Sequence, residues 1–213
     1  MKKLIKLCLL LMALLPLTVE ARTIIDLFAS EPGYVFPLLT RTVRLDMVDY
    51  YYSGQHVALP NNLGGDSELV ELDSAYLKVK TSGSKVVEMC MWTDGRKDTV
   101  IAVIETVMTP LPDSRLTLWN AQWQPFYTDR LFKMPDIDDF IVKKMPRELR
   151  ADLQDAMIFP LIELTFTGDR HRTIVATHTL DRFLAPSEYK RFADYLKPSL
   201  TYRFNGNKVK SVK

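Results

Sequence analysis

The spacing of hydrophobic residues changes along the chain, and the order of these changes predicts the fold. Beyond residue 36, apolar side chains first recur at helical spacing, while arginine and aspartate side chains lie on the opposite face. These apolar positions are Leu38, Leu45, Val48 and Tyr52. Because Pro37 suits the first turn of a helix and Gly54 suits its end, the pattern predicts a helix of about four turns.

After this helix come a polar loop and then segments in which apolar residues recur at every second position. Residues 55–68 are rich in proline, asparagine and glycine, a composition typical of loops. Later segments alternate apolar with polar residues or are rich in β-branched residues, and turn-forming residues such as Asp94-Gly95 separate them. The predicted strands are Ala75–Thr81, Lys85–Trp92, Thr99–Met108 and Arg115–Trp123. We therefore expect the first half of the chain to be a helix followed by an antiparallel meander.

The second half repeats this order of helix and strand. Gly168 and the Asn205-Gly206 pair mark the turns of two predicted hairpins. The predicted helices are Asp136–Lys144, Pro146–Met157 and Ser187–Leu196, with Ser187 as the N-cap of the last, and the predicted strands are Leu161–Thr167, Arg172–His178, Leu200–Phe204 and Lys208–Val212. We expect an α+β fold, either duplicated in tandem at residues 22–130 and 131–213 or forming a single domain over residues 22–213.

The first 21 residues have the pattern of an export signal. Three lysines precede an apolar run at residues 7–17, and Val19 and Ala21 occupy the small-residue positions of a cleavage site. The run is shorter than the roughly 20 residues that a membrane-spanning helix needs. Cys8 lies inside the run and not at the cleavage site, so no lipid anchor is expected. We predict cleavage near Ala21 and a soluble periplasmic or secreted protein with no transmembrane segment.

Removal of this signal leaves a neutral protein with one cysteine. It takes away three lysines and one glutamate, so 28 − 3 = 25 basic and 26 − 1 = 25 acidic side chains remain. A protein that binds nucleic acid needs a concentrated positive surface, so we exclude a nucleic-acid partner. Cys90 cannot form an intramolecular disulfide by itself. Stability must therefore come from packing, and the full sequence is 47% hydrophobic.

Four aromatic residues near position 120 form the candidate ligand-binding site. Trp119 and Trp123 lie four residues apart on a predicted strand, which places them on one face about 13 Å apart. Phe126 and Tyr127 follow closely. Aromatic rings along an exposed strand can stack on the apolar face of a sugar ring. The alternative is that these rings fill the core, where large aromatic residues are usually found.

No sequence motif assigns a catalytic residue, a metal or a cofactor. The chain lacks the Gly-x-Ser-x-Gly elbow, a phosphate-binding glycine loop and the spacings of zinc ligands. Cys90 lies in an apolar strand with no basic partner close in sequence, so it is interpreted as a core residue. The three histidines, His56, His171 and His178, are expected to be solvated or locally hydrogen-bonded.

The densest acidic cluster is interpreted as a helix cap. Asp136, Asp138 and Asp139 lack the glycine and closing glutamate that a calcium loop requires. Asp136 instead suits the start of a helix, whose first turn favours negative charge. No metal site is therefore predicted here.

Three aromatic segments carry a resemblance to a known family. They are Tyr50-Tyr51-Tyr52-Ser53-Gly54, Trp92-Thr93-Asp94-Gly95 and the region of Trp119. With the N-terminal signal, they make the chain similar to an uncharacterised domain-of-unknown-function family of exported proteins from Bacteroides-like bacteria. The resemblance implies a Gram-negative envelope and adds no catalytic residue. The tandem layout is also similar to that of a secreted β-lactamase inhibitor protein, a scaffold that binds partners on its sheet face.

These observations favour an exported, non-enzymatic binding or interaction protein of the bacterial envelope. Its expected partner is a protein or glycan of unknown identity. The alternative is a hydrolase that acts on an envelope or dietary polymer through two carboxylates brought together by folding.

Overall fold

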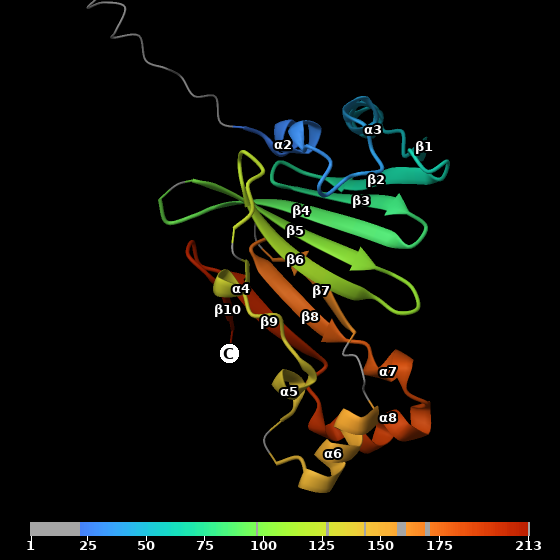
Figure 1. Cartoon of the computed structure of the whole chain (residues 1–213), viewed down its shortest axis with the longest axis vertical. Coiled ribbons are helices and arrows are strands. Elements are labelled where there is room, and N and C mark those ends of the chain that lie inside the picture. Colours follow the sequence, from blue (N-terminus) through green and yellow to red (C-terminus); the bar gives the residue numbers. More distant parts are fainter. Residues whose placement is uncertain are drawn as a thin grey trace, which may run out of the picture.

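The chain folds into two antiparallel sheets with helices on one outer face and at one end (Figure 1). This computed structural model describes residues 22–96, 98–126, 128–142, 144–156, 161–168 and 171–212. Helices α2 (Ile24–Ser30) and α3 (Arg41–Tyr52) cover one face of the first sheet, and the second sheet packs against its other face. The predicted α+β fold is confirmed.

Helix α3 begins later than its hydrophobic spacing predicts. Its N-cap is Thr40, whose side-chain oxygen accepts a hydrogen bond from the Val43 N–H at 3.3 Å. This cap, and not Pro37, defines the start of the helix. The buried side chains are Arg44, Met47 and Val48, so the predicted face is confirmed at Val48, only half-buried at Leu45 and wrong at Tyr52, which is exposed. A buried arginine shifted the face, and helical spacing of apolar residues cannot reveal it.

The first sheet is a six-stranded meander in which the strands lie in chain order. Its strands are β1 (Leu59–Pro60), β2 (Asp66–Leu72), β3 (Tyr76–Ser82), β4 (Lys85–Thr93), β5 (Thr99–Val107) and β6 (Asp113–Asn120). The predicted meander agrees with β3 to β6, but the predicted loop at residues 55–68 contains β1 and the start of β2. A bulge between Leu69 and Glu71 breaks the alternation of β2, so its period-two pattern is hidden in the sequence.

The second sheet is a four-stranded meander interrupted by helices. Its strands are β7 (Ile162–Thr167), β8 (Thr173–His178), β9 (Ser199–Phe204) and β10 (Val209–Ser211). The accompanying helices are α4 (Thr128–Leu131), α5 (Ile137–Phe140), α6 (Arg147–Ala156), α7 (Leu180–Phe183), α8 (Pro186–Phe192) and the 3-10 helix η2 (Ala193–Tyr195). Helix α8 has Ala185 as its N-cap and Pro186 in its first turn, so Ser187 is not the cap as predicted. Figure 1 shows α5 to α8 gathered at the end far from α2 and α3.

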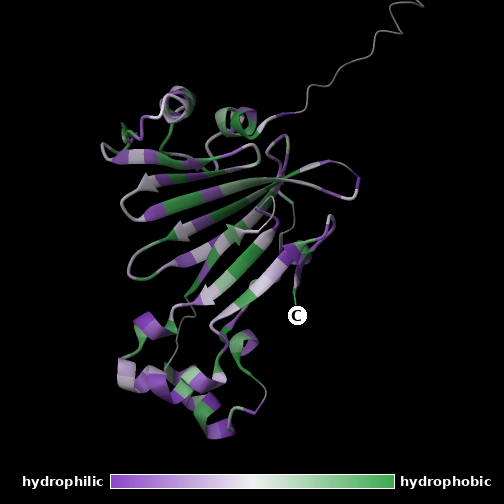
Figure 2. Cartoon of the chain, turned by 180° about the vertical axis from the view of Figure 1, so that it is seen from behind, coloured by the Kyte–Doolittle hydropathy of each residue, from purple (hydrophilic) through white to green (hydrophobic). Residues whose placement is uncertain are grey.

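The six-stranded sheet has a hydrophobic core on each face. One core lies under α2 and α3, and the larger one lies between the two sheets. Trp92 stands within the larger core, where its ring stacks on Phe204 at 4.6 Å and meets Phe166 edge-on at 5.6 Å. Figure 2 shows the hydrophobic positions along the strands of both sheets. Because strands β4 and β5 are covered on both faces, their sequences are apolar at most positions.

Side chains of the first sheet also bind the backbone edge of β7. Three successive outward N–H groups of β7 donate to side-chain oxygens of β4 and β6. The pairs are Ile162 to Asp113 (3.4 Å), Leu164 to Ser114 (2.9 Å) and Phe166 to Glu88 (3.1 Å). Residues on both sides of the predicted boundary at 130 therefore share one core and one set of polar contacts. The tandem duplication stays a prediction.

Among the described residues, no helix is both long enough and apolar enough to cross a membrane. The predicted N-terminal export signal lies outside the described residues, so both the signal and its cleavage stay predictions.

Candidate functional site

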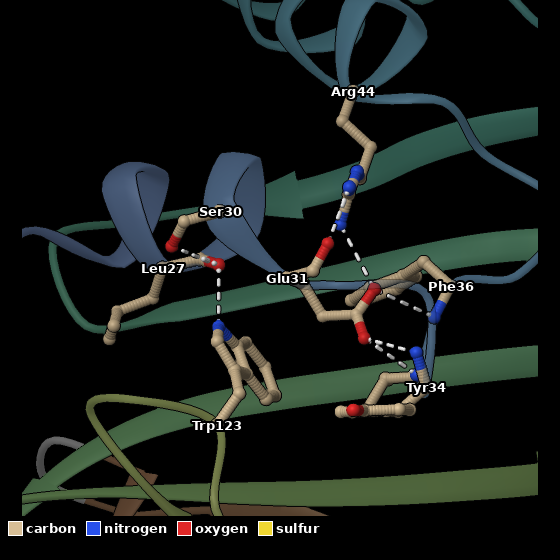
Figure 3. Close-up of polar contacts among 8 residues, drawn as sticks. Leu27, Ser30, Glu31, Tyr34, Phe36, Arg44 and Trp123 are labelled. Carbon is tan, nitrogen blue, oxygen red and sulfur yellow. Dashed lines mark hydrogen bonds and ion pairs between the residues drawn. The ribbon is translucent and has the colours of Figure 1, made fainter.

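The two tryptophans of the predicted binding site do not share a strand. Strand β6 ends at Asn120, and Trp123 follows in a turn with a φ of 58°. Their ring centroids are 5.9 Å apart and tilted by 60°, so the expected separation of about 13 Å along one strand is wrong. Trp123 is only 4% exposed, and its indole N–H donates to the carbonyl of Leu27 at 3.2 Å (Figure 3). Trp123 therefore anchors α2 to the sheet and cannot present its ring to a ligand.

Trp119 remains at the surface and stacks on Tyr34, a residue far from it in the sequence. Its half-buried ring lies 5.9 Å from the ring of Tyr34, and the two planes differ by only 5°. The Trp119 indole N–H donates to the hydroxyl of Thr117 at 3.0 Å, which fixes the ring orientation. Tyr34 is 66% exposed. The stack thus presents one broad aromatic surface beside β6.

Phe126 lies beside Leu118, one residue from Trp119, because the chain turns back along β6. Its N–H donates to the carbonyl of Leu118 at 2.8 Å, and Pro125 forms an antiparallel bridge with Trp119. The Phe126 side chain is 38% exposed. Tyr127, the fourth predicted residue, lies outside the described residues. The structure therefore places Trp119 and Phe126 along the same strand edge, and it adds Tyr34 on the side of Trp119.

A groove of about 390 Å³ runs along β6 beside these rings. Its volume is within the range of roughly 300–1,000 Å³ that is typical of ligand pockets. Arg115 and Asp129 line it, and neither forms an ion pair with another described residue. The remaining lining residues are Ser114, Leu116, Thr117, Leu118, Trp119, Pro125, Phe126, Thr128, Phe132 and Met134. We refer to this feature as the β6 groove.

A buried ion pair holds the loop that presents Tyr34 (Figure 3). The Glu31 carboxylate accepts hydrogen bonds from the N–H groups of Tyr34 at 2.5 Å, Val35 at 2.9 Å and Phe36 at 3.3 Å. Arg44 donates to the same carboxylate at 3.0 Å and to the Glu31 carbonyl at 2.7 Å. Burial lowers the pKa of Arg44, and the Glu31 charge opposes this shift. Because one carboxylate binds three successive amides, the loop has a defined shape.

Cys90 is a core residue, as its apolar strand indicates. It is fully buried, and burial raises the pKa of its thiol, which therefore stays protonated. Its sulfur lies 3.5 Å from the backbone carbonyl of His171. The His171 ring instead stacks on Tyr76 at 4.0 Å and has its Nε2 atom 2.8 Å from the Asp73 carboxylate. The arrangement does not generate a thiolate nucleophile.

The acidic cluster caps a helix, as predicted. The Asp136 carboxylate accepts a hydrogen bond from the N–H of Asp138 at 2.9 Å, while the Asp139 carboxylate accepts one from the N–H of Asp136 at 3.0 Å. Asp138 also forms an exposed ion pair with Arg150. No three metal-ligating side chains gather at one point in the part of the chain that the structure describes.

Comparisons with known proteins place the fold and the family. The chain has the fold of a domain of an uncharacterised protein from Porphyromonas gingivalis W83, with a TM-score of 0.76 and 24% identity over 87% of this chain and 97% of that one. No curated protein matches the chain. A family model described as a protein of unknown function, DUF3256, matches residues 16–209. The expected resemblance to a family of unknown function is thereby confirmed, and the chain belongs to the DUF3256 family.

Proposed function

We propose that this chain is a non-enzymatic binding domain whose partner occupies the β6 groove beside the Tyr34–Trp119 stack. The stack itself carries the proposal, because an exposed tyrosine lies parallel to a half-buried tryptophan at the mouth of a groove. Tyrosine and tryptophan supply much of the energy at binding surfaces, since they bury a large area with few rotatable bonds.

The rigidity of the loop supports this role. Glu31 and Arg44 fix the backbone at Tyr34 before any partner arrives, so little conformational entropy is lost on binding. A buried ion pair is weak support for stability by itself. Its position under an exposed aromatic residue gives it a second use, the preorganisation of a contact surface.

We further propose that the domain works in the bacterial envelope after export. The support is the N-terminal sequence, in which lysines precede a short apolar run and small residues precede the expected cleavage after Ala21. The partner is then a protein or a glycan of the envelope. The β6 groove has one lining carboxylate among the described residues, Asp129, so no observation favours the paired-carboxylate hydrolase.

The test compares what the mature wild-type protein and three variants retain from an envelope extract. Trp119→Ala and Tyr34→Ala remove the stack, while Tyr52→Ala removes a tyrosine ring on α3 that is 68% exposed, close to the 66% of Tyr34. Proteins and glycans recovered by each are quantified by mass spectrometry, and circular dichroism verifies folding. We expect a partner that the wild type and Tyr52→Ala retain and that the two stack variants lose by at least about tenfold, the effect of roughly 1.4 kcal/mol. Equal recovery by all four proteins, or no specific recovery, would contradict the proposal.

A further inference from the structure

Strand β6 is the last strand of the six-stranded sheet and has an open edge. Leu118 directs its backbone toward this edge, because its carbonyl accepts from the Phe126 N–H and its N–H donates to the Thr128 hydroxyl at 3.1 Å. Backbone directions alternate in an antiparallel pair, and the register between β5 and β6 is unbroken. The N–H and C=O of Leu116 must therefore also point away from β5.

Leu116 lines the β6 groove, and its outward backbone groups have no partner there among the described residues. Residues 124–126 run antiparallel beside only the last part of β6, and the chain then turns into α4. The β6 groove therefore occupies the space beside residues 115–117. An open strand edge of this kind is a template for another strand.

We infer that the β6 groove binds an extended polypeptide, which adds to β6 as a short antiparallel strand opposite Arg115, Leu116 and Thr117. The added strand lies beside β6 in line with residues 124–126, which cover only the last part of that edge. This inference rests on the proposed binding function and names the class of its partner. Backbone hydrogen bonds give the affinity, and the groove side chains select the sequence.

The faces of β6 specify which side chains the added strand should carry. Residues opposite each other in an antiparallel pair point to the same face. The residue opposite Leu116 lies on the face of the inter-sheet core, with Phe132 and Met134, and should be apolar. The residue opposite Thr117 lies on the face of Trp119 and should be aromatic. The residue opposite Arg115 meets a guanidinium that forms no ion pair with another described residue and should be acidic.

From its N-terminus, the added strand should therefore carry an aromatic, an apolar and an acidic side chain in turn. The probe is the C-terminally amidated pentapeptide Tyr-Val-Glu-Thr-Thr, titrated by calorimetry into the mature wild-type protein; it begins opposite Thr117 because Phe126 already occupies the position opposite Leu118. Its valine should exchange both hydrogen bonds with Leu116, whereas the N–H of its glutamate should face solvent. N-methylation at the valine should weaken binding by at least about tenfold, because it removes one hydrogen bond and adds a clash. N-methylation at the glutamate is the matched control and should change affinity by less than about twofold.

A charge exchange tests the register. Arg115→Glu should weaken binding of the probe by about three- to tenfold, and a probe with lysine in place of glutamate should regain that loss on the variant. Arg115 is exposed and on an edge strand, so the variant is expected to fold, and urea unfolding verifies this.

Two results would overturn strand addition. One is equal weakening by both N-methyl groups, which indicates side-chain contact without backbone pairing. The other is that the pentapeptide does not bind, whereas the wild type still captures a glycan that Trp119→Ala loses. That result would keep the binding function and change the partner from a polypeptide to a glycan. If neither the pentapeptide nor any protein or glycan from the envelope extract bound in a manner that depends on Trp119, the binding function itself would be overturned.

Discussion

The fold sets the charge state of His178 by burying it. The side chain packs near the rings of Phe140 at 5.3 Å and Tyr189 at 6.3 Å, and neither ring nitrogen has hydrogen-bond geometry with a described residue. Burial lowers the pKa of His178, while the Asp181 carboxylate and the nearby backbone of His178 and Lys197 partly oppose this shift. The expectation of a solvated or locally bonded histidine is wrong at this position, because the helices that cover it come from distant segments.

We predict that His178 makes stability fall in mild acid. Because its folded pKa is lowered, the unfolded chain takes up the proton first, and the free energy of unfolding drops as the pH falls below about 6.5. The contribution of one such group cannot exceed about 1.4 kcal/mol per pH unit. His178→Leu removes this loss, so urea unfolding between pH 7.5 and pH 5 should show a shallower pH dependence in the variant. Identical pH slopes for the two proteins would exclude the buried histidine as the cause.

At the scale of elements, the loop after α2 depends on one carboxylate. Glu31 binds three successive amides and the guanidinium of Arg44, so it determines both the path of the loop and the position of α3. An exposed ion pair elsewhere, Asp152 with Arg191 on α6 and α8, involves side chains about half exposed to solvent and fixes no loop.

Glu31→Gln should lower the free energy of unfolding by about 3 kcal/mol, because it leaves Arg44 buried and without its counter-charge. Asp152→Asn is the control and should cost less than about 1 kcal/mol. Chemical denaturation at neutral pH measures both. If the two substitutions cost the same, the Glu31–Arg44 pair does not organise the loop, and the preorganised display of Tyr34 loses its basis.

Elements whose signals are local are those that could be predicted from the chain. Strands β3 to β6 and the hairpins at Asp94-Gly95 and Asn205-Gly206 follow from alternation and turn chemistry within a few residues. Strand β2 could not, because its bulge replaces alternate burial with burial at Leu69 and Leu72. The helices α2, α4 and α7 are short, and tertiary packing has more influence on such helices than local propensity.

At the scale of the whole molecule, the two sheets are joined by polar contacts as well as by their shared core. The Ser114 hydroxyl is the central contact, since it accepts from the Leu164 N–H at 2.9 Å and lies 2.8 Å from the Thr106 hydroxyl. These bonds satisfy the open edge of β7, which would otherwise have buried unpaired donors.

Ser114→Ala should destabilise the whole chain by about 1–3 kcal/mol, because the buried Leu164 N–H then has no acceptor. Ser84→Ala, in the exposed turn between β3 and β4, is the matched control and should change stability by less than about 0.5 kcal/mol. Denaturation is followed by tryptophan fluorescence, which reports the larger core through Trp92, and by circular dichroism. If Ser114→Ala left stability unchanged, the sheets would be held by apolar packing alone.

The sequence by itself determined the fold class, most of the strands and the capping role of Asp136, because alternation, turns and caps act between residues close in the chain. Only the tertiary structure decided the candidate site. The burial of Trp123 and the stacking of Tyr34 on Trp119 depend on segments far apart in the chain, and the open backbone of Leu116 depends on the path that the chain takes from β6 into α4. No local pattern encodes these features, since the two tryptophan contacts arise only when α2 and the loop after it pack over the end of β6, and the Leu116 edge stays open only because the chain turns away into α4.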